Sequence, residues 1–418
     1  MGQTIIEKVF SRKVGRTVAA GDLVVAPVDF LMGHDANAPG GIVVLQRAGL
    51  SVGIDRKKIA LVIDHHVPCT NSTHATQHAA IRNFAQENDI PLYDIGSGIG
   101  HILMVEQGHA LPGQIAIAVD SHATTCGAVN AAGVGVGSTE MAALMATGKL
   151  WFKVPKSMRV NFTGRLQPGV FSKDVILQLV AMLGEAGANY HSVEYAGEAL
   201  AHMSMDARFT ICNMSTDMGA KTALMEVDDV ARAWLAGRSK APWEAAYADV
   251  DATYSRQINF DASALVPQLA APHRVDNAIP VTQALGTPIN QASIGTCTNG
   301  YMEDIRIAAS MLKGKRVAKG VRLYVVPGTR EIYRQAMREG LLEILFEAGA
   351  MILQANCTPC SRGVGHAIPG DGEVVLTTAN RNFRGRLGNK NASIYLGSPA
   401  TVAASAVAGV ITDPREQL

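Results

Sequence analysis

Short apolar runs alternate with segments of helical periodicity along the first part of the chain. Apolar residues dominate 58–64 and 114–120, and between them the segment 76–85 repeats apolar positions at helical spacing. Such alternation predicts parallel sheets with helices on both faces. Both apolar runs end in an acid, Asp64 and Asp120. Because ligand sites of open α/β sheets lie at the carboxyl ends of strands, we expect these carboxylates at a site.

The same alternation continues and divides the chain into units. A strand over 158–163 and a helix over 173–183 begin a second unit, while a strand over 322–327 and a helix over 331–338 belong to a third. A long segment rich in proline and polar residues predicts a partly ordered connection between them. We expect an α/β protein with three α/β/α domains and mostly parallel sheets, divided as follows: first domain 1–155, second domain 156–238, connecting segment 239–290, third domain 291–418.

Composition and charge narrow the class of protein. The chain has 418 residues, enough for two to four domains, and only 17% of them are charged, which indicates extensive buried or interface surface. A net charge of +1 without a strongly basic stretch argues against nucleic acid or an anionic membrane as partner. The amino terminus lacks the apolar core of a signal peptide, and no apolar stretch approaches about 18 residues. We therefore expect a cytoplasmic protein without disulfides.

Three of the six cysteines carry the strongest chemical signal. Cys297 lies in the segment 293–300, and Cys357 and Cys360 form a Cys-x-x-Cys pair. The pair alone is equally typical of redox dithiols, zinc half-sites and buried thiols. Three thiolates suit an iron–sulfur cluster with one iron left open, since closed zinc sites take four ligands. A helical pattern over 302–312 places Cys297 on a strand-to-helix loop, where helix amino termini favour anions.

Polar clusters accompany the cysteines. Taken alone, a histidine near a strand end is more often a hydrogen-bonded packing residue than a catalytic one. The Asp-Ser-His motif can likewise be a simple turn with a helix cap. Together they suit proton transfer to a leaving hydroxyl, for which paired Asp and His side chains are required. The clusters are Asp64-His65-His66, Gly98-Ile-Gly-His101, Asp120-Ser-His122, Asn213-Met-Ser-Thr-Asp217 and the basic run Asn380 to Arg386.

With these motifs the sequence resembles the aconitase superfamily, specifically the large subunits of 3-isopropylmalate dehydratase and homoaconitase. The resemblance covers nearly the whole chain and implies three domains arranged around a central iron–sulfur cluster. Besides the three cysteines, it is carried by the segments Val28 to Asp35, Asp120 to His122, Gly133 to Phe152, Cys212 to Met214, Asn380 to Arg386 and Gly397 to Ser405.

The resemblance also implies roles for individual residues. Cys297, Cys357 and Cys360 would bind three irons of a 4Fe–4S cluster, whose fourth iron stays open to substrate or water. Hydroxide is a poor leaving group, and a Lewis acid together with a general acid removes that obstacle. The implied catalytic pairs are Asp64 with His65 as the acid, Asp120 with His101, and Asp217 with His122. The implied substrate-binding residues are His34, Ser121, Asn213, Asn380, Arg381 and Arg386, with the two arginines clamping carboxylates.

The sequence departs from the family pattern at three positions. Asp217 stands where the family has Glu, so its carboxylate reaches about one methylene less far toward His122. Gly100 and Thr124 stand where many relatives have Cys. These changes indicate a divergent paralogue with a different small substrate. The remaining cysteines, Cys69, Cys126 and Cys212, are expected to be buried thiols.

Related single-chain aconitases carry a further swivelling domain that supplies a serine base and a substrate arginine. The chain ends without such a domain, so we expect a separate small subunit to provide both. The expected activity is reversible dehydration of a 2-hydroxy di- or tricarboxylic acid. The resemblance favours 3-isopropylmalate dehydratase of leucine biosynthesis, with homoaconitase and 2,3-dimethylmalate dehydratase as alternatives.

Two other classes of protein compete with this hypothesis. Some aconitase relatives bind RNA once the cluster is lost, but the nearly neutral charge disfavours an RNA-binding regulator. A zinc protein using Cys357 and Cys360 with His366 is the second alternative.

Overall fold

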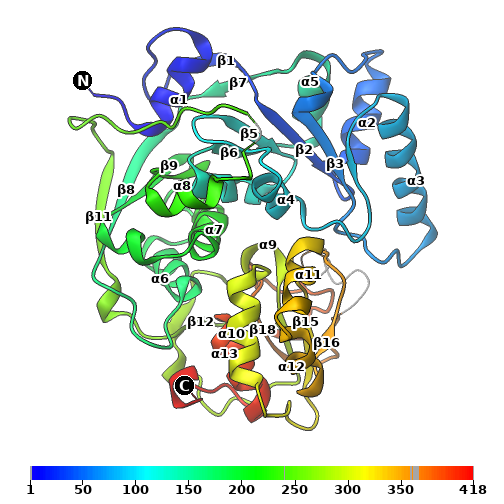
Figure 1. Cartoon of the computed structure of the whole chain (residues 1–418), viewed down its shortest axis with the longest axis vertical. Helices are drawn as coiled ribbons and strands as arrows, with labels where there is room; N and C mark the ends of the chain where they lie inside the picture. Colours follow the sequence, from blue (N-terminus) through cyan, green and yellow to red (C-terminus); the bar gives the residue numbers. More distant parts are fainter. Residues whose placement is uncertain (1, 240, 358–359, 361–366, 418) are drawn as a thin grey trace.

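A computed structural model describes residues 2–239, 241–357, 360 and 367–417 (Figure 1). The strands in these residues form four sheets, and all but the short ribbon and one edge are parallel. The predicted α/β class with mostly parallel sheets is confirmed. In the described residues no helix is long and apolar enough to cross a membrane.

The first large sheet places several polar residues at the carboxyl ends of its strands. Its strand order is β4-β3-β2-β5-β6, all parallel, so the order reverses between β2 and β5. Crevices at such switch points bind ligands in open α/β sheets. The strands are β2 Phe30–His34, β3 Ile59–Val62, β4 Leu92–Tyr93, β5 Ile115–Ala118 and β6 Ala132–Gly135; the helices are α2 Ala38–Arg47, α3 Ser72–Glu87, α4 Gly100–Glu106 and α5 Ser138–Thr147.

This sheet is buried on both faces, as parallel sheets require. Leu31, Leu61 and Ile117 pack into one hydrophobic core, whereas Ala60 and Ala118 face another core that extends into the rest of the molecule. Near-continuous apolar strands therefore end abruptly in polar residues at their carboxyl ends.

The second sheet is parallel, in the order β10-β9-β8-β11. An antiparallel ribbon of β1 and β7 lies beside α1. The elements are α1 Ile5–Val14, β1 Leu23–Pro27, β7 Lys149–Lys153, β8 Lys156–Thr163, α6 Ser172–Leu183, β9 His191–Ala196, α7 Met205–Asn213, β10 Thr222–Met225, α8 Asp229–Leu235 and β11 Arg256–Asp261.

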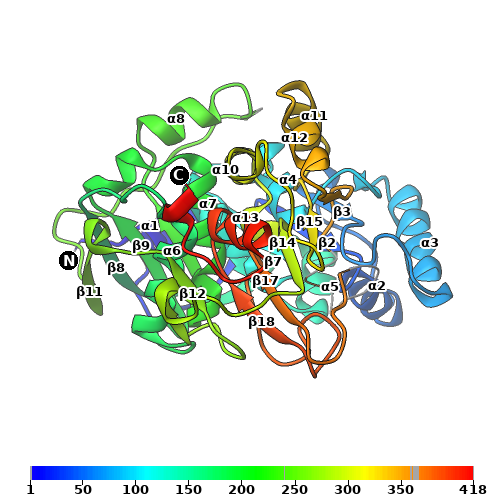
Figure 2. The same ribbon diagram turned by 90° about the horizontal axis from the view of Figure 1, so that it is seen from below.

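The third sheet carries the cysteines, in the order β13-β12-β18-β17-β14-β15-β16. Helices α10 and α13 pack against each other and on β14 (Figure 2). The elements are β12 Gln268–Ala270, β13 Ala278–Pro280, β14 Gln291–Ile294, α9 Thr296–Asn299, α10 Met302–Leu312, β15 Arg322–Val325, α11 Arg330–Arg338, α12 Leu341–Glu347, β16 Met351–Ile352, β17 Val374–Thr377, β18 Ser393–Leu396 and α13 Pro399–Ala408.

The segment 239–290 differs from the expected partly ordered connection. It contributes β11 to the second sheet and β12 and β13 to the third. Ile258 and Phe260 are buried while their neighbours on β11 are exposed, so a short alternating pattern holds this strand on the sheet edge. The division into three domains with the bounds given above stays a prediction.

Candidate active site

The sulfur atoms of Cys297, Cys357 and Cys360 form a buried group in which all lie within 4.8 Å of one another. Cys297 sits in the first turn of α9, directly after β14. The turn into α9 requires glycine, because Gly295 has φ 142° and a Cβ there would lie 2.6 Å from the carbonyl oxygen of Val326. The backbone thus folds tightly to bring Cys297 to the pair.

The thiolate form is favoured at one of the three sulfurs, because hydrogen bonding among the thiols and burial raise the pKa values of Cys297 and Cys357 well above the ordinary value. The pKa of Cys360 is held well below its ordinary value because the thiols of Cys297 and Cys357 hydrogen-bond to it. The side chain of Asn380 lies between two of the sulfurs, with its amide nitrogen 3.5 Å from Cys297 Sγ and its oxygen 3.7 Å from Cys360 Sγ. A polar donor next to buried thiols is the environment in which thiolates bind metal.

The cysteines form one wall of a cavity of about 540 Å³. The other walls come from the carboxyl ends of the first sheet and from the loop after β17. The cavity brings together ten of the residues singled out in the sequence, namely His34, His65, His101, Asp120, His122, Cys297, Cys357, Cys360, Arg381 and Arg386. Ala36, Asn37 and His66 also line it; of these only His66 belongs to a polar cluster noted in the sequence, and no individual role was predicted for any of them.

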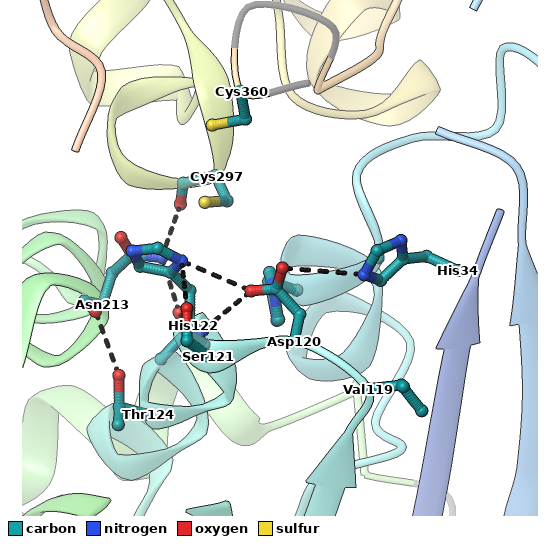
Figure 3. A network of polar contacts seen from close by, with 12 residues as sticks. His34, Val119, Asp120, Ser121, His122, Thr124, Asn213, Cys297 and Cys360 are labelled. Atoms are coloured by element: carbon teal, nitrogen blue, oxygen red, sulfur yellow. Dashed lines mark hydrogen bonds and ion pairs between the residues drawn. The ribbon is translucent and has the colours of Figure 1, made fainter. Parts of the chain in front are cut away.

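Asp120 orients three imidazoles (Figure 3). One carboxylate oxygen accepts from His101 Nε2 at 2.9 Å and from the backbone amide of His122 at 2.8 Å, while His34 Nε2 lies 3.6 Å from the other. The pKa of Asp120 is well below its ordinary value, because hydrogen bonds from His101 and His122 outweigh the opposing effect of burial. His101 Nδ1 is buried with no hydrogen-bond partner among the described residues.

Asp64 and His65 form a tight pair, with His65 Nδ1 2.6 Å from Asp64 Oδ1. The other oxygen of Asp64 accepts from the amide of Gly100 at 2.8 Å, so both ends of the carboxylate are fixed. Burial alone would lower the pKa of His65, but the negative charge and hydrogen bond of Asp64 raise it to about 10. His65 is therefore an imidazolium at neutral pH. Its ring stacks on His34, with centroids 4.1 Å apart.

Asp35 holds the loop that carries this pair. Its fully buried carboxylate accepts the backbone amides of Asp64, His65 and His66 at 3.1, 2.9 and 2.8 Å, and His78 Nε2 lies 2.9 Å away. Burial would raise the pKa of Asp35, yet these hydrogen bonds hold it far below its ordinary range. Asp35 ends one of the motifs noted in the sequence, but no role was predicted for it.

Asp217 contacts two groups of the site. Its Oδ1 accepts from Arg381 Nε at 2.6 Å, and its Oδ2 lies 3.4 Å from His122 Nε2. Arg381 Nη2 also donates to Ser121 Oγ at 3.1 Å. Burial and the charge of Arg381 both lower the pKa of His122, but Asp217 and Asp120 raise it above its ordinary value.

Three predicted substrate residues, Ser121, Asn213 and Asn380, do not line the main cavity. Asn213 donates to Thr125 Oγ1 and accepts from Thr298 Oγ1, each at 2.8 Å, and so braces α9 beneath the cysteine. Ser121 lines a neighbouring pocket rather than the main cavity. Arg386 donates to Asn380 Oδ1 at 3.3 Å, and its Nε is buried without a hydrogen-bond partner among the described residues.

A buried lysine supports the same wall. Lys173, at the start of α6, is 0% exposed and donates to the carbonyl oxygens of Thr378 and Ala379, each at 2.8 Å. Burial lowers its pKa to about 7. These carbonyls directly precede Asn380, so the lysine fixes the segment that presents Asn380 and Arg381.

The other cysteines lie outside the sulfur group. Cys126 and Cys212 are buried, as expected, but Cys69 is exposed because it lies in the loop between β3 and α3. The expectation that Cys69 is a buried thiol is therefore wrong. His366, the third ligand of the zinc alternative, lies outside the described residues.

Comparisons with known proteins agree with the motifs. A model of the aconitase family (aconitate hydratase) matches residues 7–409. The 3-isopropylmalate dehydratase large subunit 1 of Methanopyrus kandleri is 43% identical over 420 residues and covers all of both chains. The probable methanogen homoaconitase large subunit of Methanosarcina mazei is 44% identical over 392 residues, 94% of this chain and 99% of its own.

A solved structure supports the fold. The crystal structure of Thermococcus kodakaraensis aconitase X (holo-form) aligns with a TM-score of 0.51 and 12% identity, over 90% of this chain and 89% of that one. The likeness at this level of identity concerns the fold alone.

Proposed function

The chain belongs to the aconitase family, and we propose that it is the large, cluster-bearing subunit of a hydro-lyase acting on 3-isopropylmalate. Relatives named as 3-isopropylmalate dehydratase large subunits are 43% identical over the whole chain, from Methanopyrus kandleri to Halothermothrix orenii. Homoaconitase and 2,3-dimethylmalate dehydratase remain the alternatives. The observation that carries the proposal is the cavity lined by three buried cysteines and by His65, which is paired with Asp64.

Cys297, Cys357 and Cys360 would hold a 4Fe–4S cluster with one iron open toward the cavity. The fit rests on three buried sulfurs within 4.8 Å of one another and on the absence of a fourth cysteine from the described group. When bound, such a cluster supplies a Lewis acid for hydroxyl and carboxylate oxygens.

His65 would serve as the general acid. Because its Nδ1 faces Asp64, its remaining N–H, on Nε2, is available to the cavity that the ring lines. The raised pKa of His65 keeps this proton in place at neutral pH until a departing hydroxyl accepts it. Asp120 would orient His101 and His122 in the same cavity, and Asp217 would support His122.

The arginines would bind the substrate carboxylates. Arg381 is held by Asp217 and Ser121, so its orientation is fixed before substrate arrives. Arg386 donates to Asn380, and its Nε has no hydrogen-bond partner within the part of the chain that the structure describes. Planar guanidinium groups pair with carboxylates through two parallel hydrogen bonds, which suits a dicarboxylic acid. His34, 3.6 Å from Asp120, would contact the substrate from the first sheet.

We further propose a small subunit as partner. The relatives are named large subunits, and the described residues that line the cavity include no serine. Ser121 Oγ is already engaged by Arg381. The serine base and a further arginine would then come from the small subunit, which completes the cavity.

The test is a substrate panel with the reconstituted complex. The chain would be co-produced with its small subunit, loaded with iron and sulfide without oxygen, and offered 3-isopropylmalate, homocitrate and 2,3-dimethylmalate. Formation of the unsaturated acid is followed by ultraviolet absorbance. We expect the highest kcat/KM with 3-isopropylmalate. A higher value with another of these acids would overturn the substrate, and no turnover of any would overturn the activity.

A further inference from the structure

Asp35, His66 and His78 form a second group of potential metal ligands beside the cysteine cavity. Their ligand atoms lie within 4.8 Å of one another, and the group shares no residue with the cysteines. Asp35 Oδ2 is the common point, 2.9 Å from His78 Nε2 and 3.8 Å from His66 Nδ1. His66 Nδ1 is buried and has no hydrogen-bond partner in the described part of the chain. We propose that these three side chains bind a divalent transition-metal ion.

The ligand types at this site indicate which metal ions it would bind. Two imidazoles and one carboxylate are the ligands of open zinc sites and of non-haem ferrous sites. With metal–ligand distances near 2.1 Å, donors around a tetrahedral ion stand about 3.4 Å apart. The observed separations of 2.9 and 3.8 Å fall on either side of that value. Each imidazole therefore needs only a small movement relative to Asp35, and all three ligand atoms already lie within 4.8 Å of one another. These ligands suit zinc or ferrous iron.

Asp35 keeps enough acceptor capacity for an ion. Its Oδ1 receives the amides of Asp64 and His65, whereas its Oδ2 receives the amide of His66 and the imidazole of His78. An ion at Oδ2 replaces only the His78 N–H. The two amide bonds that position the Asp64–His65 pair stay intact.

Cys69 can accept a hydrogen bond from His78 Nδ1 when the ring proton of His78 moves there from Nε2. Cys69 Sγ lies 3.1 Å from His78 Nδ1. Without metal, Nε2–H donates to Asp35 and Nδ1 accepts from the thiol. With metal on Nε2, the single ring proton sits on Nδ1 and is donated to Cys69 Sγ. Metal-binding histidines commonly donate their second ring N–H in this way, which fixes the tautomer.

The cavity provides access to the group. His66 lines the same cavity as the cysteines, so an ion that enters the cavity reaches His66 without opening the core. A metal ion bound to Asp35 would also affect the Asp64–His65 pair, because Asp35 accepts hydrogen bonds from the backbone amides of both residues.

The experiment titrates the full, thiol-reduced chain with Co²⁺ and records its absorption spectrum. Thiolate-bound Co²⁺ gives sulfur charge-transfer bands, whereas Co²⁺ on imidazole and carboxylate gives only weak d–d bands, so the two groups are separable. We expect one equivalent without charge transfer. His66→Gln and His78→Gln should each weaken this equivalent about tenfold or more and leave the thiolate bands unchanged. His202→Gln, on the exposed surface, is the control and should match the wild type.

Two results would overturn the site. Wild-type chain that shows only thiolate-bound Co²⁺ would do so, as would unchanged non-thiolate binding in both glutamine variants. His66 is partly exposed, so His66→Gln decides the question even where replacing the buried His78 prevents folding. Because the thiolate bands report separately on the cysteines, failure here leaves the proposed cluster site standing.

Discussion

Asp217 Oδ1 accepts a 2.6 Å hydrogen bond from Arg381 Nε, whereas its other oxygen lies 3.4 Å from His122 Nε2. The shorter side chain, Asp in place of Glu, therefore holds the arginine more closely than the histidine. Asp120, which bonds both the amide and ring of His122, takes over much of the orientation of that imidazole. We propose that Asp217 acts mainly as a positioning residue for Arg381.

Replacing Asp217 tests this relationship. In Asp217→Asn the guanidinium of Arg381 loses its charged partner, so we expect KM for the dicarboxylic acid to rise about tenfold or more with a smaller change in kcat. Steady-state kinetics of the complex measure both constants. A fall confined to kcat would instead make the contact with His122 the important one.

The pH dependence of activity tests the Asp64–His65 pair. Burial opposes the charged ring, but Asp64 raises the pKa of His65 to about 10, so His65, the proposed acid, stays protonated across neutral pH. In Asp64→Asn this support is lost, and we expect the alkaline limb of the kcat/KM profile to move down by about one to three pH units. An alkaline limb at the same pH in the variant would contradict the assignment of His65 as the acid.

Asp35 is predicted to contribute strongly to stability. Its pKa is depressed, so its contribution is present above the ordinary carboxyl pKa and is lost only as the pH falls far below it. Asp35→Asn removes the charge that accepts three backbone amides, and we expect a loss of about 3 kcal/mol in unfolding free energy at neutral pH. Urea unfolding measures this loss. Asp371→Asn, an exposed carboxylate bonded to amide side chains, is the control and should change stability little.

Lys173 predicts a change of stability with pH in the alkaline range. Its pKa falls to about 7 on folding, so between about pH 7 and its ordinary pKa the unfolded chain binds more protons. The stability of the wild type should therefore gain a contribution from Lys173 as pH rises through this window. Lys173→Met should lose that contribution, as urea unfolding at several pH values would show. An identical pH slope in both proteins would mean that the buried lysine does not change its charge on folding.

The sequence indicated the candidate site residues, but it did not indicate how the fold brings them together. Asp64 and Asp120 could be placed at a site because each ends an apolar run. Their convergence depends on the strand order of the first sheet, which local pattern does not encode. Asp35 was missed because it bonds mainly to backbone amides, a contact without a sequence signature. The pairing of Asp217 with Arg381 spans 164 residues and two units of the fold.

The segment 239–290 shows a second limit of sequence patterns. Its prolines predicted a loose connection, but short strands at sheet edges tolerate proline and need only a few buried side chains. Cys69 was expected to be buried because free cysteines usually are, whereas it is exposed in the loop between β3 and α3.

The central claim is that Cys297, Cys357 and Cys360 hold a cluster with one open iron. The most direct measurement is iron, zinc and sulfide analysis of the chain reconstituted without oxygen, with an electron paramagnetic resonance spectrum after mild oxidation. We expect about four irons and four sulfides per chain and a three-iron signal as the open iron leaves. Zinc without sulfide, or no metal at all, would contradict it.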